Sequence, residues 1–596
     1  MTPVRAVDEA VGQRPTATDS SARSPRRLAE AWAYAGYLAL AVVVLSQLWR
    51  DPDGRVLARN DDDHGFFMFV LAHGERVLFH GANPFFSDRL NMPDGVNLMA
   101  NTSVLALSLP AAPITHFFGA GGSVVLLLTL GLSGTAAAWY WVLSRHLVRS
   151  RPAAWIGGLW CGFCPAMVAH ANGHINFVSQ FVVPFIVWQV IRLREPGRIL
   201  RGGTILALLV VLQVFINEEI LLFTALTLGV FVVGYAVMAP RAAIEASRRF
   251  VAGLGVALSV AAVLLAYPLW FQFAGPGSYH GQPFLPDEYV TDLLSVGAYA
   301  RQSLAGDDAA ASRLSVSATE DNTFFGLPVL FVLAVAVAVL WRSVAARATA
   351  LAGLVLLVVS MGTRLRVGGR DTGISLPFGL VSHIPVIDLV SVTRFAMVTA
   401  TVVGVLLALA ADRIGAQLRP WRVAFWIGLA VALVPVLPKP LPTVVADPLP
   451  PFIAAGSWRS YVPDGRSLVT VPLPEVTTGR TGMRWAALSG LEFRVPRGYF
   501  MGPLNPPADR TGSWSAPRRF TSDLLNAVQV QGRQPVLTAA DRQAFAADLA
   551  FWRAAVVVLV PNSPHGEALR ATVADLFERP PRLVGGVWLW EIPPRG

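Results

Sequence analysis

Apolar runs of membrane-spanning length recur along the first three quarters of the chain and limit its fold more than any other feature. A helix needs about 20 apolar residues to cross a bilayer. The composition agrees, with 54% hydrophobic and 14% charged residues, whereas soluble proteins carry about 25% charged residues. We therefore predict a mainly α-helical, polytopic core of about eleven spans: 31–49, 122–144, 153–170, 177–193, two within 204–238, 251–272, 323–341, 348–361, 393–411 and 423–437.

The positive charge is almost entirely arginine, clustered in short loops between the apolar runs. That pattern is typical of the cytoplasmic loops of membrane proteins rather than of a nucleic-acid-binding face. It predicts a cytoplasmic N-terminus, an extracytoplasmic C-terminus and a turn at "NEE" (217–219) within 204–238. Segment 103–118 contains Pro110 and Pro113 and is interpreted as a surface helix, because counting it as a span would place Arg145 outside.

The chain divides into three predicted parts. Residues 1–27 are polar and are expected to form a disordered cytoplasmic tail, and residues 28–439 form the transmembrane domain, with 50–121 as its first extracytoplasmic loop. Residues 440–596 have no span but alternate short β-like runs with helical stretches. About 155 residues suffice for one soluble domain, so this part is predicted to be an extracytoplasmic α/β domain.

Ionisable and polar side chains from five separate segments are predicted to gather at the outer face. These segments contain "NDDDHGFF", "HANGHINF", "NEE", "ATEDN" and "SVTRF". Ionisable groups at membrane depth are costly and usually functional. The candidate site residues are Asp61, Asp62, Asp63, His64, His174, Asn176, Glu218, Glu219, Glu320 and Arg394.

This set of side chains suits group transfer from a lipid phosphate. A carboxylate can take the proton of an attacking hydroxyl, and a guanidinium matches a phosphate with two hydrogen bonds. Asp62 and Asp63 are also candidate ligands for Mg²⁺ or Mn²⁺, although the sequence leaves the need for a metal open. No P-loop, HExxH or zinc-finger spacing is present.

The order of these features resembles the GT-C superfamily of integral membrane glycosyltransferases. The stretches that carry the resemblance are "HGANPFFSDRLNMPDGVNLMANTS", "GHINFVSQFVVPFIV", "FINEEILLF" and "SVTRFAMV". It implies an inverting transferase in the cytoplasmic membrane that moves a sugar from a polyprenyl-phosphate donor to a cell-envelope glycan, glycolipid or glycoprotein, with arabinan or mannan synthesis as examples. In that family the first outer loop carries a catalytic Asp.

The resemblance leaves several roles open. Asp62 or Asp63 is expected to be the base, with Asp61 as a third candidate, and Arg394 to neutralise the leaving phosphate. The other candidate residues are expected to line the pocket. Two alternatives remain: a transporter or lipid-handling protein without bond chemistry, and a non-catalytic scaffold of envelope assembly. Against a transporter, the acids lie at one predicted face rather than at the midplane, and no internal repeat is seen.

Overall fold

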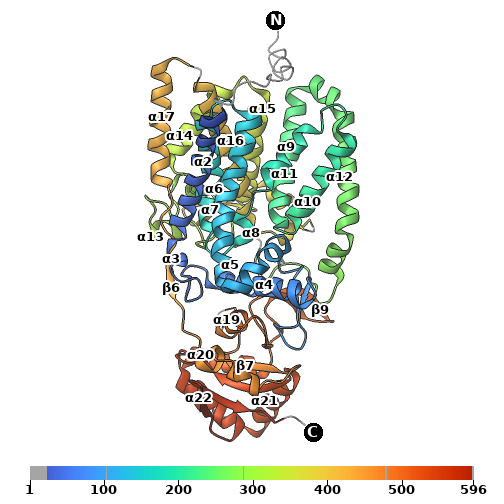
Figure 1. The fold of residues 1–596 in the computed structure, drawn as a ribbon, viewed down its shortest axis with the longest axis vertical. Coiled ribbons are helices and arrows are strands. Elements are labelled where there is room, and N and C mark those ends of the chain that lie inside the picture. Colours follow the sequence, from blue (N-terminus) through green and yellow to red (C-terminus); the bar gives the residue numbers. More distant parts are fainter. Residues whose placement is uncertain are drawn as a thin grey trace.

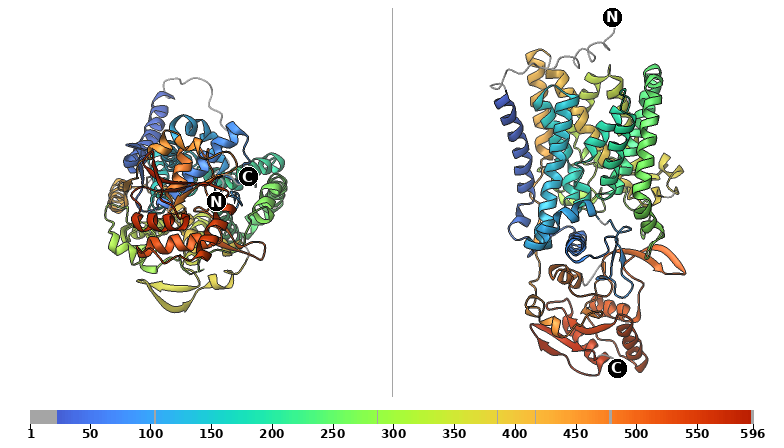
Figure 2. Two further views of the ribbon diagram at one scale, coloured as in Figure 1. Left: turned by 90° about the horizontal axis from the view of Figure 1, so that it is seen from below. Right: turned by 45° about the vertical axis from the view of Figure 1, so that its right-hand side comes forward.

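The computed structural model describes residues 23–593 except 103, 286, 385, 416 and 477–479. Long helices run side by side in a bundle, and an α/β unit lies beyond one end of it (Figure 1). Helices α4 (Asp61–His80) and α19 (Thr481–Leu488) lie between the bundle and that unit, and a second view agrees (Figure 2). Of the expected tail, residues 1–22 lie outside the described residues, and α2 begins at Arg23.

Each predicted span coincides with an apolar helix or part of one. Within the described residues, seven helices are long and apolar enough to cross a membrane: Arg27–Val44, Leu105–Leu147, Arg151–His170, Glu218–Met238, Pro240–Ala274, Val392–Gly415 and Arg419–Val436. The other four predicted spans match shorter apolar helices: Val183–Arg192, Ile199–Val214, Leu327–Leu340 and Val344–Ser360. The chain is therefore a multi-pass membrane protein.

The helices of the bundle follow one another along the chain. Their bounds are α2 (Arg23–Val44), α5 (Leu105–Val142), α6 (Arg151–Phe163), α7 (Pro165–His170), α8 (Ile175–Val178), α9 (Val183–Arg192), α10 (Ile199–Val214), α11 (Glu218–Met238), α12 (Pro240–Ala274), α14 (Leu327–Leu340), α15 (Val344–Ser360), α16 (Ala396–Gly415) and α17 (Arg419–Leu433).

Two predicted boundaries are visible in the backbone. Helix α5 is interrupted at Gly119, whose φ of 75° and ψ of 169° are not helical, so the segment that ends near residue 118 is distinct from the following span. At "NEE", the chain turns between α10 and α11. The side chain of Asn217 accepts a hydrogen bond from the backbone N–H of Ile220 at 3.0 Å, which caps α11 at its N-terminus.

The C-terminal part contains a four-stranded sheet in the order β11 (Arg582–Val584), β12 (Val587–Glu591), β10 (Ala554–Leu559), β7 (Ser467–Val471). The β10–β7 pair is parallel and the other pairs are antiparallel. Three of these strands and helix α21 (Ala539–Phe551) fall where the β-like and helical runs predict them.

Every residue of β7 and β10 is buried, so both faces of these two strands are covered, which explains why β10 is a continuous apolar run. Val469 and Val557 pack with helices α20 (Phe520–Gln531), α21 and α22 (Gly566–Phe577). Their chain neighbours Leu468 and Val556 belong instead to the core that continues into the bundle. Alternation of side chains along each strand thus connects the C-terminal unit to the rest of the molecule.

The segment between α2 and α5 is bound to the C-terminal part at several places. Strand β1 (Arg55–Leu57) pairs with β6 (Thr443–Val445). The backbone N–H of Asn91 donates to Arg497 O at 3.0 Å, and the side chain of Asn101 bonds the backbone of Met501, the first residue of β8 (Met501–Asn505). Strand β8 forms a hairpin with β9 (Asp509–Trp514). These bonds hold C-terminal residues against the N-terminus of α4.

Candidate functional site

The three consecutive acids occupy the first turn of α4. Asn60 is the residue that caps this helix, and its side-chain oxygen faces the backbone N–H of Asp63. The N-terminus of a helix carries partial positive charge, so the acidic turn stabilises α4. Successive residues in a helix point about 100° apart, and Asp61, Asp62 and Asp63 therefore face different surroundings.

Asp63 is the acid that points into the protein. It accepts hydrogen bonds from His174 Nε2 at 2.7 Å, Asn60 Nδ2 at 2.7 Å and the Tyr499 hydroxyl at 3.0 Å. Burial disfavours the charged carboxylate, but the charge of His174 and these three hydrogen bonds outweigh it and lower the pKa of Asp63 to about 2. Asp63 is consequently ionised at neutral pH.

A chain of hydrogen bonds continues from Asp63 through two histidines. His174 Nδ1 lies 2.8 Å from His170 Nδ1, and His170 Nε2 lies 3.1 Å from Asn322 Oδ1. Asn322 in turn donates from Nδ2 to Glu320 Oε2 at 2.9 Å. The two imidazoles thus join the carboxylate of Asp63 to the amide of Asn322 in one line of contacts.

Arg394 ends this chain. Its Nε donates to Glu320 Oε1 at 2.9 Å, and its Nη1 lies 3.3 Å from Glu219 Oε1. The guanidinium also covers the ring of Phe177, with 4.6 Å between Cζ and the ring centroid. The Glu219 side chain is 31% exposed and that of Glu320 is 4% exposed. The Glu219 contact is thus the longer and more accessible of the two carboxylate contacts.

We call Asp63, His174, His170, Asn322, Glu320, Arg394 and Glu219 the charged network. Every member lies at a helix end or in a connecting loop, at the end of the bundle from which α4 begins. Their positions are the first turns of α4 and α11, the C-terminus of α7, the turn before α8, the loop before α14 and the short turn Val392–Phe395 before α16.

The remaining predicted residues lie outside this network. Asp61 and Asp62 face Arg480 of the C-terminal part, with which both form ion pairs. Glu218 accepts a hydrogen bond from Gln272 at 2.9 Å. His64 and Asn176 are 1% and 5% exposed, and neither ring nitrogen of His64 has a hydrogen-bond partner within the part of the chain that the structure describes.

Several residues that contact the charged network are not among the candidates predicted from the sequence. Asn60 and His170 carry a detectable signal, because one precedes an acidic helix start and the other is four residues before His174. Tyr499 gave no such signal: it reaches Asp63 from 436 positions away in the sequence. Trp514, which stacks on Tyr499 with 5.6 Å between ring centroids and is 37% exposed, lies beside it.

The carboxylates in this arrangement do not form a divalent-metal site. Among the described residues, no group of three or more His, Cys, Asp or Glu side chains is placed to hold a metal ion. Asp63 Oδ2 and His174 Nε2 contact each other directly at 2.7 Å, and Asp62 faces Arg480. A metal would have to separate these pairs, so the residues as placed do not fit a divalent cation.

The buried His64 predicts a sensitivity to acid. Burial, followed by the positive charge of Arg484, lowers the pKa of His64 from 6.5 to about 4. A group with a lowered folded-state pKa contributes stability above its unfolded pKa and loses it as the pH falls through the folded value. We expect about 3 kcal/mol of stability to be lost between pH 6.5 and 4. Thermal unfolding across this range should show a steeper decline for the wild type than for His64→Phe, and equal slopes would contradict this assignment.

The turn that contains Gly173 leaves little room for a side chain at this position beside α4. Its φ is +110°, and a Cβ there would lie 3.2 Å from Asn60 Nδ2 and 3.2 Å from the His64 backbone nitrogen. Gly173→Ala should therefore lower stability by about 2 kcal/mol or more, because backbone strain and this contact add. Gly197→Ala is the matched control, since Gly197 has φ +73° but nothing within 4 Å of its Cβ position. Equal losses in melting temperature would show that the contact has no effect.

The fold and this network together define a multi-pass membrane protein with a buried charged site at one end of its bundle. The chain is similar to solved structures of an oligosaccharyltransferase from Archaeoglobus fulgidus. One, AglB with an inhibitory peptide and a dolichol-phosphate, has a TM-score of 0.43 and 14% identity, covering 90% of this chain and 69% of that one. The apo form has a TM-score of 0.46 and 12% identity, covering 89% and 69%.

A further structure of the archaeal enzyme is a complex with Zn and sulfate, with a TM-score of 0.43, 12% identity and coverage of 88% and 67%. No protein-family model matches the chain, and no curated protein matches it.

Proposed function

We propose that this protein is an inverting GT-C-type glycosyltransferase that uses a polyprenyl-phosphate sugar. Its acceptor would be a cell-envelope glycan, glycolipid or glycoprotein. The observation that carries the proposal is the convergence of five distant segments into one network that joins an ionised carboxylate, Asp63, to a buried guanidinium, Arg394. These are the two groups that sugar transfer from a lipid phosphate needs.

Asp63 would act as the general base. The acceptor oxygen attacks the anomeric carbon of the donor sugar, the bond from that carbon to the phosphate oxygen breaks, and the acceptor proton passes to Asp63. Displacement from the side opposite the phosphate inverts the anomeric configuration. Asn60, His174 and Tyr499 hold the carboxylate in place.

Arg394 would bind the phosphate of the donor and stabilise the charge that develops on it as it leaves. Arg394 is bound to two carboxylates, so the phosphate has to replace one of them. The longer and more exposed contact with Glu219 is the one expected to open, whereas Glu320 at 2.9 Å keeps the guanidinium oriented.

The proposed site lies on the extracytoplasmic side of the cytoplasmic membrane, with the N-terminus inside and the C-terminal α/β part outside. The arginine clusters between the spans support this orientation. The acceptor would reach Asp63 past the ion pairs that Arg480 forms with Asp61 and Asp62. Trp514, which lies beside Tyr499, would stack on a sugar ring. The position of the network at helix ends favours this enzyme over a transporter, whose ionisable groups would lie along the membrane interior.

The proposal can be tested with the purified protein in liposomes that contain polyprenyl-phosphate sugars and extracted envelope glycans. The expected result is protein-dependent release of free polyprenyl phosphate together with the appearance of sugar on the acceptor. Movement of a lipid or an ion across the liposome membrane without loss of sugar from the donor would favour the transporter. If the donor stays intact and nothing crosses, the scaffold hypothesis would be favoured.

A further inference from the structure

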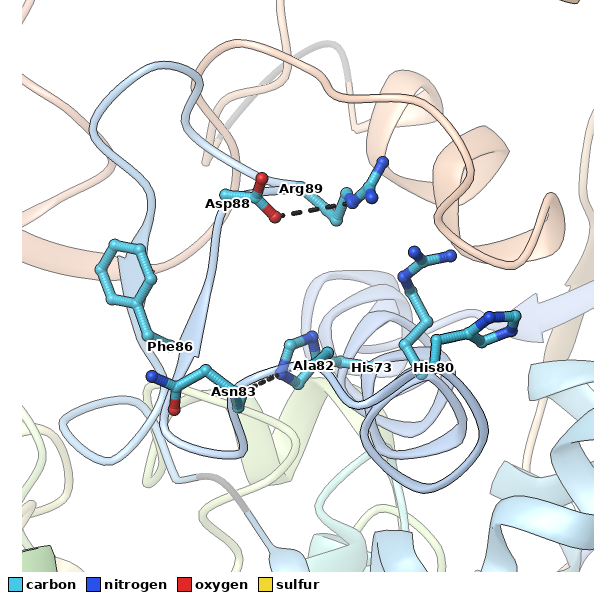
Figure 3. Close-up of a pocket in the computed structure, with 8 residues that line it drawn as sticks. His73, His80, Ala82, Asn83, Phe86, Asp88 and Arg89 are labelled. Carbon is cyan, nitrogen blue, oxygen red and sulfur yellow. Dashed lines mark hydrogen bonds and ion pairs between the residues drawn. The ribbon is translucent and has the colours of Figure 1, made fainter. Parts of the chain in front are cut away.

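A cavity of about 270 Å³ lies beside the C-terminal half of α4, outside the charged network. It is lined by His73, Arg76, His80, Ala82, Asn83, Phe86, Asp88 and Arg89. In the close-up, Phe86 borders it on one side and His80 on the other, with Asp88 and Arg89 above His73 and Asn83 (Figure 3). A hydrogen bond of 2.9 Å from His73 Nε2 to Asn83 O fixes its floor.

The cavity carries an excess of positive charge. Its single lining carboxylate, Asp88, pairs with Arg494 at 2.8 Å and with Arg89 at 3.5 Å, so one carboxylate is shared by two guanidinium groups. Arg76 has no carboxylate within ion-pair distance in the part of the chain that the structure describes, and its contact is with Gly490 O at 3.4 Å. Burial and the nearby charges of Arg76 and Arg494 lower the pKa of Arg89. A bound anion would relieve this repulsion between guanidinium groups.

The residues of α4 that line the cavity lie on the face of this helix that meets the C-terminal part. His73, Arg76 and His80 lie on one face of α4, since they are separated by three and four residues. At 100° per residue, Leu78 lies on nearly the opposite face, and its side chain is 52% exposed. On the cavity side, Arg76 and Arg89 contact Gly490 O and Glu492 O of the C-terminal part. A ligand would therefore come from the aqueous side.

The size of the cavity favours a ligand larger than a bare ion. Water occupies about 30 Å³ in the liquid, so the cavity has room for about nine waters, and it approaches the lower limit of about 300 Å³ for small-molecule sites. Phe86 offers an apolar wall, and aromatic rings commonly pack against the C–H faces of sugars. Guanidinium groups match carboxylate or phosphate oxygens.

We propose that this cavity binds an oxyanion carried on a sugar, with Arg76 and Arg89 holding the carboxylate or phosphate and Phe86 packing against the ring. Arg76 follows Asp63 by 13 residues in the same helix, which corresponds to about 20 Å. On the proposed function, the ligand is a distal unit of an acidic acceptor glycan whose reacting end lies at Asp63. Oxyanion binding itself does not depend on the proposed function.

The test is calorimetric titration of the full-length purified protein with glucuronate, glucose and inorganic phosphate. We expect saturable binding of glucuronate, no binding of glucose, and weaker binding of phosphate than of glucuronate. Arg76→Gln should weaken glucuronate binding about tenfold or more, because a charge-assisted hydrogen bond is lost. Arg518→Gln is the matched control, since Arg518 is 62% exposed and pairs with Asp523 elsewhere in the C-terminal part.

Absence of glucuronate binding, or binding that Arg76→Gln leaves unchanged while its melting temperature equals that of the wild type, would overturn the inference. Phosphate binding without glucuronate binding would overturn the assignment to a sugar-borne anion. No donor lipid is present in these titrations, so their failure is distinct from failure of the proposed transfer reaction. Transfer that persists in Arg76→Gln without glucuronate binding would remove the cavity from acceptor recognition.

Discussion

Asp63→Asn is expected to reduce sugar transfer by about 10²- to 10⁴-fold, the range typical of losing a general base. Asparagine keeps the shape of the side chain and can retain the contact with Tyr499, but it cannot accept the proton of the acceptor hydroxyl. The measurement is the rate of sugar transfer from a polyprenyl-phosphate donor in liposomes. Binding of polyprenyl phosphate should stay within about twofold of the wild type, because Arg394 is unchanged.

Asp61→Asn and Asp62→Asn are the matched controls. Both residues precede Asp63 in the same helical turn but face Arg480 rather than the histidines. We expect each to retain transfer to within about tenfold. If Asp63→Asn transfers sugar at the wild-type rate, Asp63 is not the base. If Asp62→Asn loses much more activity than Asp63→Asn, Asp62 is the base instead.

Arg394→Gln should abolish detectable binding of polyprenyl phosphate and lower stability by about 3–5 kcal/mol. It removes the cation that would meet the phosphate, and it leaves Glu320 and Glu219 without the charge that compensates them. Because this variant is expected to fold poorly, Arg394→Lys is measured beside it. Lysine keeps the charge but not the two-pronged geometry, so we expect it to fold and to bind the phosphate about tenfold more weakly.

Glu219→Gln is expected to strengthen the binding of polyprenyl phosphate, whereas the Arg394 variants weaken it. Its carboxylate competes with the incoming phosphate for Arg394 Nη1, so neutralising it should strengthen the binding of polyprenyl phosphate about three- to tenfold. Titration of the purified variants with this lipid in detergent checks both directions. If Glu219→Gln and Arg394→Lys weaken binding equally, the ion pair is a structural element and the exchange of partners does not occur.

The sequence does not predict which of Glu218 and Glu219 contacts Arg394. Both are predicted site residues at a helix start, and the structure confirms the turn that precedes them. Glu219 contacts Arg394, whereas Glu218 accepts a hydrogen bond from Gln272. Adjacent helical residues point about 100° apart, so the choice between them depends on how α11 is rotated against its neighbours, and the sequence does not encode that rotation locally.

Packing also decides which of the acids in "NDDDHGFF" meets the histidines. The sequence left Asp62 and Asp63 as alternative bases, with Asp61 as a third candidate. The contacts of α4 with the turn before α8 place Asp63 against His174, and this packing makes Asp63 the candidate. Three acids at this position are explained in part by the helix N-terminus, which stabilises all of them.

The sequence by itself determined the apolar helices, the turn at "NEE", three strands and one helix of the C-terminal part, and the kinds of side chain in the loops that form the charged network. These features follow from hydrophobic length, periodicity and helix capping, which act between residues close in the chain. The tertiary structure decided that Tyr499 reaches Asp63, that Asn322 meets His170, and that Glu219 meets Arg394. These contacts join residues more than a hundred positions apart, and they exist only once the helices have packed in one arrangement.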